Sequence, residues 1–157
     1  MTIRPAVAAD VPVILDLIRG LAEYERAPEQ VVCDEARLLE SLFGDKPEAE
    51  VLLACVGSVA AGFAVYFHNY STWWGRRGIY LEDLFVRPDM RGQGIGKALL
   101  RELAKVARDR QCARLEWSVL DWNQPAIDFY RSLGAESKDE WTTFRLNRPE
   151  IEKLAGS

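Results

Sequence analysis

The stretch that decides the fold of this chain is Arg91-Gly92-Gln93-Gly94-Ile95-Gly96-Lys97. It follows an apolar run at residues 80–86 and opens a helical pattern at residues 95–110. A strand that ends in closely spaced glycines before a helix leaves backbone N–H groups exposed, and the helix N-terminus adds roughly half a positive charge. Arg91 adds a cation that suits phosphate oxygens. We therefore expect this turn to bind a phosphate or pyrophosphate, although glycine-rich turns also occur where nothing binds.

Two familiar nucleotide motifs do not fit this spacing. A P-loop requires Ser or Thr directly after its lysine, whereas Ala98 follows Lys97. A dinucleotide fingerprint that begins at Gly92 requires a glycine at position 97, which is lysine. The expected ligand is therefore phosphorylated but is neither ATP nor NAD.

The same turn, preceded by Leu-Phe-Val-Arg-Pro at residues 84–88, resembles the acyl-CoA signature of the GNAT superfamily of N-acetyltransferases. Four more segments share the resemblance: Ile3-Arg4-Pro5-Ala6, Leu21-Ala22-Glu23-Tyr24-Glu25, Tyr80-Leu81-Glu82-Asp83 and Trp122-Asn123-Gln124-Pro125-Ala126-Ile127-Asp128-Phe129-Tyr130. Together they are similar to the spermidine/spermine (diamine) acetyltransferase branch and its thialysine-acetylating relatives. The resemblance implies an α/β fold with a mixed, mostly antiparallel central sheet, flanking helices and strands splayed at the acyl-CoA site. It also implies a single N-acetyltransferase domain over residues 1–157.

Acetyl-CoA is the cosubstrate that the resemblance implies. Its pantetheine arm would pair with the main chain of residues 84–86 like an added strand, whereas the alternative is that these residues form only a core strand. Asn123 would bond to the same arm, and it is equally expected to cap the last helix. The complete set of expected cofactor-binding residues is Leu84, Phe85, Val86, Arg91, Gly92, Gln93, Gly94, Ile95, Gly96, Lys97, Asn123 and Ala126.

Two acidic residues, Glu82 and Asp83, interrupt an otherwise apolar strand, which costs free energy unless they are paired or exposed. Neighbours on a strand face opposite sides, so we expect at most one of them to point into a given cleft. The resemblance implies that Glu82 is catalytic, binding the substrate ammonium and receiving its proton, and that Asp83 also binds substrate. The alternative is an ion pair with a nearby arginine.

Tyr130 follows the helix start at residues 123–125, and a tyrosine at helical spacing is usually a core residue. The resemblance instead implies that Tyr130 is the catalytic general acid. A phenol of pKa about 10 can donate to a thiolate whose conjugate acid has a pKa of about 8.5.

Tyr24 and Glu25 match the polyamine-contacting pair of the family and are our expected substrate-binding residues at the end of the first helix. Without the resemblance they are an ordinary solvated helix end. Trp73 and Trp74 would form either a wall of a cation-binding channel or a dimer interface.

Bulk properties narrow the class of partner. The net charge of −4 over 157 residues, without a cluster of Lys or Arg, disfavours nucleic acid and anionic membranes. The uncharged run at residues 51–67 is shorter than the roughly 20 residues of a membrane-spanning helix and is divided by Gly57, so it predicts a hairpin. Three widely separated cysteines and one histidine predict free thiols and no metal site. With no secretory signal pattern, we expect a cytoplasmic protein.

Periodicity and capping signals predict an alternating order of elements. The expected segments are a strand at 2–4, a helix capped by Asp10, a helix from Asp34 to Gly44, strands at 51–56 and 59–67, a loop at 69–78, a strand at 79–86, a helix at 95–110, a strand at 114–120, a helix at 124–133 and a closing strand at 141–146.

The sequence thus predicts an acetyl-CoA-dependent N-acetyltransferase that acylates a primary amine of a small cationic substrate, such as a diamine or polyamine. Direct attack within a ternary complex is the expected route. The alternatives are an acetyltransferase for another amine, namely a thialysine-like amino acid, an aminoglycoside or a protein N-terminus, and a non-catalytic acyl-CoA-binding module. The resemblance also favours a homodimer.

Overall fold

The computed structural model describes residues 1–156, and the chain divides into two compact units, Met1–Leu120 and Asp121–Ser157. The first unit contains β1 (Thr2–Pro5), α1 (Val11–Tyr24), α2 (Glu35–Phe43), β2 (Glu50–Val56), β3 (Val59–Ser71), β4 (Arg76–Val86), α3 (Ile95–Asp109) and β5 (Leu115–Trp117). Short 3-10 turns lie at Ala8–Asp10, Pro28–Gln30 and Pro88–Met90. The second unit contains α4 (Gln124–Ser132) and α5 (Arg148–Ala155).

The strands of the first unit form one sheet in the order β1-β2-β3-β4-β5. Strands β1 to β4 are antiparallel to their neighbours, whereas β5 runs parallel to β4. The turns before β3 and β4 contain Gly57 and Gly75 at φ values of 62° and 61°, a backbone conformation that glycine adopts readily. The expected mixed, mostly antiparallel sheet with flanking helices is confirmed.

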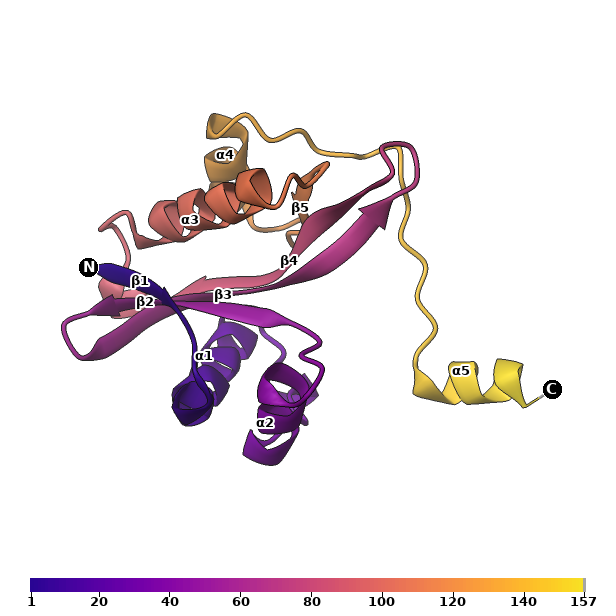
Figure 1. The fold of residues 1–157 in the computed structure, drawn as a ribbon, viewed down its shortest axis with the longest axis horizontal. Helices are drawn as coiled ribbons and strands as arrows, with labels where there is room; N and C mark the ends of the chain where they lie inside the picture. The colour runs from indigo at the N-terminus through magenta and orange to yellow at the C-terminus, as the bar shows by residue number, and fades with distance from the viewer. Residues whose placement is uncertain (157) are drawn as a thin grey trace. The chain divides into compact units, whose positions relative to one another are not determined.

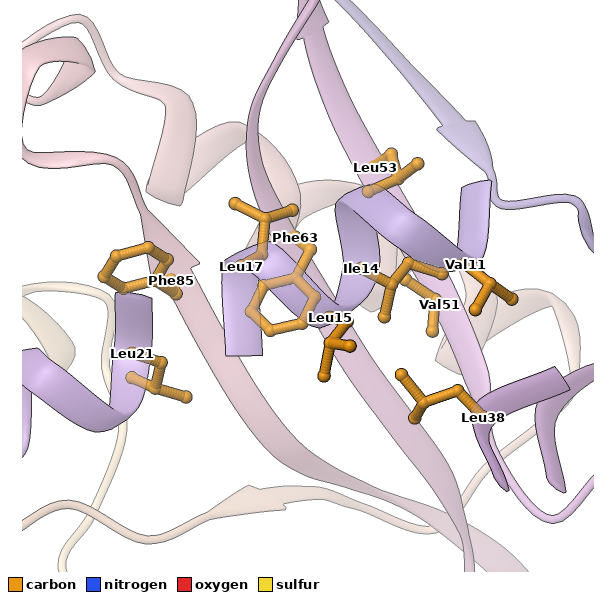
Figure 2. Packing of buried hydrophobic residues seen from close by; sticks show 10 residues of the cluster. All are labelled: Val11, Ile14, Leu15, Leu17, Leu21, Leu38, Val51, Leu53, Phe63 and Phe85. Atoms are coloured by element: carbon orange, nitrogen blue, oxygen red, sulfur yellow. The ribbon is translucent and has the colours of Figure 1, made fainter. Parts of the chain in front are cut away.

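Helices cover both faces of this sheet, with α1 and α2 on one face and α3 on the other (Figure 1). The buried residues of α1 pack against Leu53 and Phe63 in the middle of the sheet and against Phe85 near the end of β4 (Figure 2). On α3, the buried side chains are Ile95, Leu99, Leu100 and Leu103. Burial of each such side chain contributes roughly 1.5–3 kcal/mol, so this packing fixes α1 and α3 against the sheet.

Capping follows the prediction at one helix and departs from it at another. The Asp34 side chain accepts a hydrogen bond from the Arg37 amide at 2.9 Å, as expected for an N-cap. Asp10 precedes α1, but its carboxylate is engaged by Arg4 at 2.8 and 2.9 Å and by the Val7 amide at 2.7 Å. Asp10 therefore links β1 to the start of α1 through its bonds with Arg4, and it does not cap α1.

The β3–β4 hairpin is longer than the sequence predicted. The expected loop at residues 69–78 is wrong at both ends, because β3 runs to Ser71 and β4 begins at Arg76. Pairing between β3 and β4 holds the polar residues at both ends of this range, and Gly78, in strand conformation, although their own strand propensity is low. Strand β5 is shorter than the predicted 114–120.

The expected closing strand at residues 141–146 is also wrong. A strand requires a neighbour for its backbone hydrogen bonds, and none of the pairings within residues 1–156 includes this segment. Instead the second unit ends in α5, which has Glu150 in its first turn and Lys153 in its last, both favourable for the helix dipole. None of the helices that residues 1–156 form combines the length and apolarity needed to span a bilayer.

Candidate active site

The glycine turn lies between β4 and α3, where the sequence predicted it. Gly92 and Gly94 have φ values of 83° and 79°, and a Cβ added to either would meet no atom within 4 Å. Gly94 precedes α3 without a side-chain cap, so the first helical amides, including those of Gly96 and Lys97, have no acceptor within the helix. Ile95 is different, since its side chain is buried and only its main chain faces the turn. This backbone fits a phosphate group.

Strand β4 has an open edge beside the turn. Strand β5 pairs with it only as far as Leu81, so within residues 1–156 only β3 pairs with residues 83–86. Main-chain groups of alternate residues face alternate sides of an antiparallel strand. Because the Phe85 carbonyl faces β3, those of Leu84 and Val86 face the open edge. This is the splayed arrangement that was expected, and it fits an extended chain carrying amide groups.

Phe85 itself does not fit the cofactor-binding role expected of it. Its carbonyl faces Gly62 on β3, and its ring is buried in the core beside α1. The two neighbours on β4 have main-chain groups at the open edge, but Phe85 offers none there because of the alternation of the strand.

A bulge in β4 changes where the acidic residues point. The pairing with β3 passes from Leu81 directly to Asp83, so Glu82 has no partner residue on that strand. Asp83 is opposite Val65, which packs against the core on the α1 face. Such a bulge interrupts the alternation of side chains, so the opposite-facing arrangement expected for Glu82 and Asp83 does not hold. Both carboxylates interact electrostatically with Glu25 at the end of α1.

We call Glu25, Glu82 and Asp83 the acidic cluster. Burial, followed by the charges of Glu82 and Glu25, raises the pKa of Asp83 to about 6. Burial and then the charge of Glu82 also raise the pKa of Glu25. Crowded carboxylates with raised pKa values are stabilised when a cation binds among them, so the cluster suits a positively charged ligand. Sequence reasoning found all three residues but not the bulge that brings them together, because no Gly or Pro marks it.

Arg91 reaches from the glycine turn toward the end of α1. Its Nε donates to the Val86 carbonyl oxygen at 2.9 Å. Its guanidinium carbon lies 4.7 Å from the centroid of the Tyr24 ring and 5.5 Å from that of the Phe85 ring. These distances are within the range of cation–π attraction. No local pattern predicts this contact, because Tyr24 and Arg91 are far apart in the sequence.

The second unit carries Asn123, Ala126 and Tyr130. The Asn123 side-chain oxygen accepts a hydrogen bond from the Ala126 amide at 3.4 Å, so the expected helix cap is confirmed. Tyr130 lies near the end of α4 and is half-buried, with its ring centroid 5.7 Å from that of Phe129.

The two neighbouring tryptophans lie in the turn between β3 and β4. The exposed fraction is 94% for Trp73 and 70% for Trp74. Strand β4 begins at Arg76, after Trp74, and at about 3.3 Å per strand residue it places Glu82 roughly 20 Å from that start. The channel-wall interpretation is therefore wrong for the acidic cluster of the same chain, and the dimer interface stays a prediction.

The sequence model of the Acetyltransferase (GNAT) family matches residues 15–135, a range that includes the acidic cluster, the glycine turn and α4. The chain belongs to this family.

The similarity of this GNAT enzyme to its relatives extends over nearly its whole length. Thialysine N-epsilon-acetyltransferase of Bos taurus is 42% identical over 98% of this chain and 96% of its own. Spermidine/spermine N(1)-acetyltransferase-like protein 1 of Homo sapiens is 38% identical over 98% of this chain, which spans only 23% of that longer protein. A solved integron cassette protein of V. cholerae has a TM-score of 0.83 at 27% identity and covers 99% of this chain and 98% of its own. The protein is thus an N-acetyltransferase similar to the spermidine/spermine branch.

Proposed function

We propose that this enzyme transfers an acetyl group from acetyl-CoA to a primary amine of a small cationic substrate such as a diamine or polyamine. The observation that carries the proposal is the acidic cluster of Glu25, Glu82 and Asp83. Burial and then the repulsion of Glu82 and Glu25 raise the pKa of Asp83, and an ammonium group relieves that repulsion. A diamine or polyamine keeps a second positive charge after one nitrogen has been deprotonated for reaction.

Acetyl-CoA supplies the activated acetyl thioester when it is bound. We infer that the amides of residues 92–97, with Arg91, Gln93 and Lys97, hold its pyrophosphate, since the backbone at Gly92 and Gly94 is open. The main chain of Leu84 and Val86 at the open edge of β4 suits the amide groups of pantetheine. Asn123 and Ala126 retain the cofactor-binding role implied by the family resemblance.

Direct attack requires a neutral amine, so the substrate ammonium must first lose a proton. We assign the proton acceptor to Glu82, the residue at the bulge of β4. Asp83, Glu25 and Tyr24 bind the remaining positive charge of the substrate. As the nitrogen forms its bond to the acetyl carbon, the carbon–sulfur bond breaks and a thiolate leaves. The nitrogen then releases its second proton to solvent, which gives the neutral amide.

The departing thiolate requires a proton, and we assign its donor to Tyr130. The support is the position of Tyr130 in the pattern Asn123-x-x-Ala126-x-x-Phe129-Tyr130, together with a phenol pKa close enough to that of a thiol for transfer. We also infer that both compact units belong to one N-acetyltransferase domain, since the family match from residue 15 to residue 135 crosses the boundary between them.

A second candidate substrate is a thialysine-like amino acid, because the bovine relative that bears this activity in its name is 42% identical. It also presents a primary amine, but it adds a carboxylate that the acidic cluster would repel. The charge of the cluster thus favours the diamine.

We further propose a cytoplasmic homodimer. The dimer is supported by the exposure of large hydrophobic side chains in the second unit, which are Trp141, Phe144, Leu146, Ile151 and Leu154. The cytoplasmic location rests on the sequence alone. Sedimentation equilibrium measures the mass in solution, and a monomer at micromolar concentration would contradict the proposal.

Release of CoA, measured with a thiol reagent across a panel of amines, tests the catalytic proposal. The panel contains diamines, a polyamine, thialysine, an aminoglycoside, an N-terminal peptide and a monoamine with a neutral tail. We expect the highest kcat/KM for a diamine or polyamine and a value at least about tenfold lower for the neutral-tailed amine, as one lost ion pair with a partly buried carboxylate predicts. Equal kcat/KM values for the diamine and the neutral-tailed amine would show that the acidic cluster does not recognise the substrate. No CoA release with any amine would favour a non-catalytic binding module.

A further inference from the structure

One side chain, Arg91, joins the glycine turn to the end of α1. Its Nε bonds to the Val86 carbonyl at 2.9 Å, and its guanidinium lies 4.7 Å from the centroid of the Tyr24 ring. Tyr24 directly precedes Glu25 of the acidic cluster. Arg91 thus contacts both a residue assigned to the amine and a carbonyl on the edge assigned to pantetheine.

Both of these contacts use groups that the proposed substrates require. The face of a tyrosine ring that is covered by a guanidinium at this distance is not available to a second cation. The Val86 carbonyl faces the open edge of β4, where the cofactor arm would bond. Phosphate oxygens are a stronger partner for a guanidinium than either a neutral carbonyl or a ring, because the hydrogen bond is then assisted by opposite charges.

We propose that Arg91 couples the binding of the two substrates, because it occupies the amine position on Tyr24 until acetyl-CoA draws it to the pyrophosphate. The guanidinium is an internal cation that competes with the substrate ammonium for the same ring. Binding of the cofactor takes the Val86 carbonyl, gives Arg91 a phosphate partner and uncovers Tyr24. Amine binding therefore depends on prior cofactor binding. This inference rests on the proposed function, since it assigns Tyr24 and the glycine turn to the two substrates.

The size of the effect follows from the contact that is exchanged. Arg91 has two arrangements, one on Tyr24 and one on the pyrophosphate. A ligand changes the equilibrium between them only by as much as its affinities for the two arrangements differ. A cation–π contact at a partly exposed site corresponds to roughly a 2- to 30-fold change in affinity. Saturation with the cofactor should therefore tighten amine binding by that factor, and by linkage the amine should tighten cofactor binding equally.

Calorimetric titration of 1,3-diaminopropane into the enzyme, with and without saturating CoA, measures this coupling without turnover, because CoA carries no acetyl group. We expect the unmutated enzyme to bind the diamine roughly 2- to 30-fold more tightly with CoA. Arg91→Gln should bind it more tightly than the unmutated enzyme in the absence of CoA, and CoA should then change its affinity less than twofold. Arg101→Gln, which removes an exposed arginine of α3, is the matched control and should retain the coupling.

A second variant, Tyr24→Leu, removes the ring for which the two cations compete. Its diamine affinity should be the same with and without CoA, and weaker than that of the CoA-bound unmutated enzyme. Coupling that survives in Arg91→Gln or in Tyr24→Leu would overturn the inference, as would equal affinities in the unmutated enzyme. CoA that binds without affecting the diamine overturns only this inference, whereas failure of CoA to bind at all overturns the proposed function as well.

Discussion

Replacement of Asp83 by asparagine should stabilise the folded protein at neutral pH. Burial and the charges of Glu82 and Glu25 raise the pKa of Asp83 from an ordinary value of 3.8 to about 6. At pH 7 the carboxyl is ionised in surroundings that favour its neutral form. Asparagine has nearly the same shape and carries no charge, so Asp83→Asn relieves the cost.

The magnitude follows from the difference between the two pKa values, since a difference of about two is worth roughly 3 kcal/mol. Between about pH 4 and pH 6 the folded protein holds a proton that the unfolded chain has lost, so the unfolding free energy falls as pH rises through this window. The unfolding free energy of Asp83→Asn does not fall in this way, because asparagine does not ionise. Its advantage over the unmutated protein should be near zero at pH 4 and reach about 1–3 kcal/mol at pH 8, the lower figure allowing for relaxation around the charge.

Urea unfolding at several pH values between 4 and 8 measures this difference. The comparison between variant and unmutated protein is essential, because Asp10 and Glu50, whose pKa values are lowered by Arg4 and Arg110, give the opposite slope at low pH. Glu40→Gln, which neutralises an exposed carboxylate on α2, is the matched control and should leave the profile unchanged. Parallel pH profiles for Asp83→Asn and the unmutated protein, with equal denaturant slopes, would refute the burial of Asp83 among like charges.

Three further predictions concern the proposed roles. Gly94→Val should abolish acetyl-CoA affinity in calorimetry, whereas the control Gly75→Val, at a comparable φ of 61° instead of 79°, should lower stability alone. Undiminished affinity in folded Gly94→Val would show that the phosphate site lies elsewhere. Glu82→Gln should lower kcat/KM for a diamine more than Glu25→Gln does, with acetyl-CoA binding nearly intact in both, and the reverse order would assign the proton acceptor elsewhere. Tyr130→Phe should lower kcat about 10²–10⁴-fold with little change in melting temperature, whereas a stable variant with near-normal kcat would remove Tyr130 from the mechanism.

The elements that the sequence predicted well are those whose signals are local. The helix Val11–Tyr24 and the helix Ile95–Asp109 follow from apolar residues recurring at the helical period. The errors arose where strand pairing decides the outcome. Residues 69–78 belong mostly to paired strands despite their turn-like composition, and residues 141–146 form no strand despite their β-forming composition. Strand formation depends on a neighbouring strand, which is often remote in the sequence, so composition misleads in both directions.

The sequence by itself determined the family resemblance, the glycine turn and the capping role of Asn123, because a φ preference and a cap depend on only a few consecutive residues. Only the tertiary structure decided how the charged groups meet. The bulge at Glu82 depends on register with β3, and the approach of Arg91 to Tyr24 depends on how α1 and the turn after β4 are held by the sheet. Both arise from contacts between segments distant in the chain, whose geometry is set by the packing of the whole core.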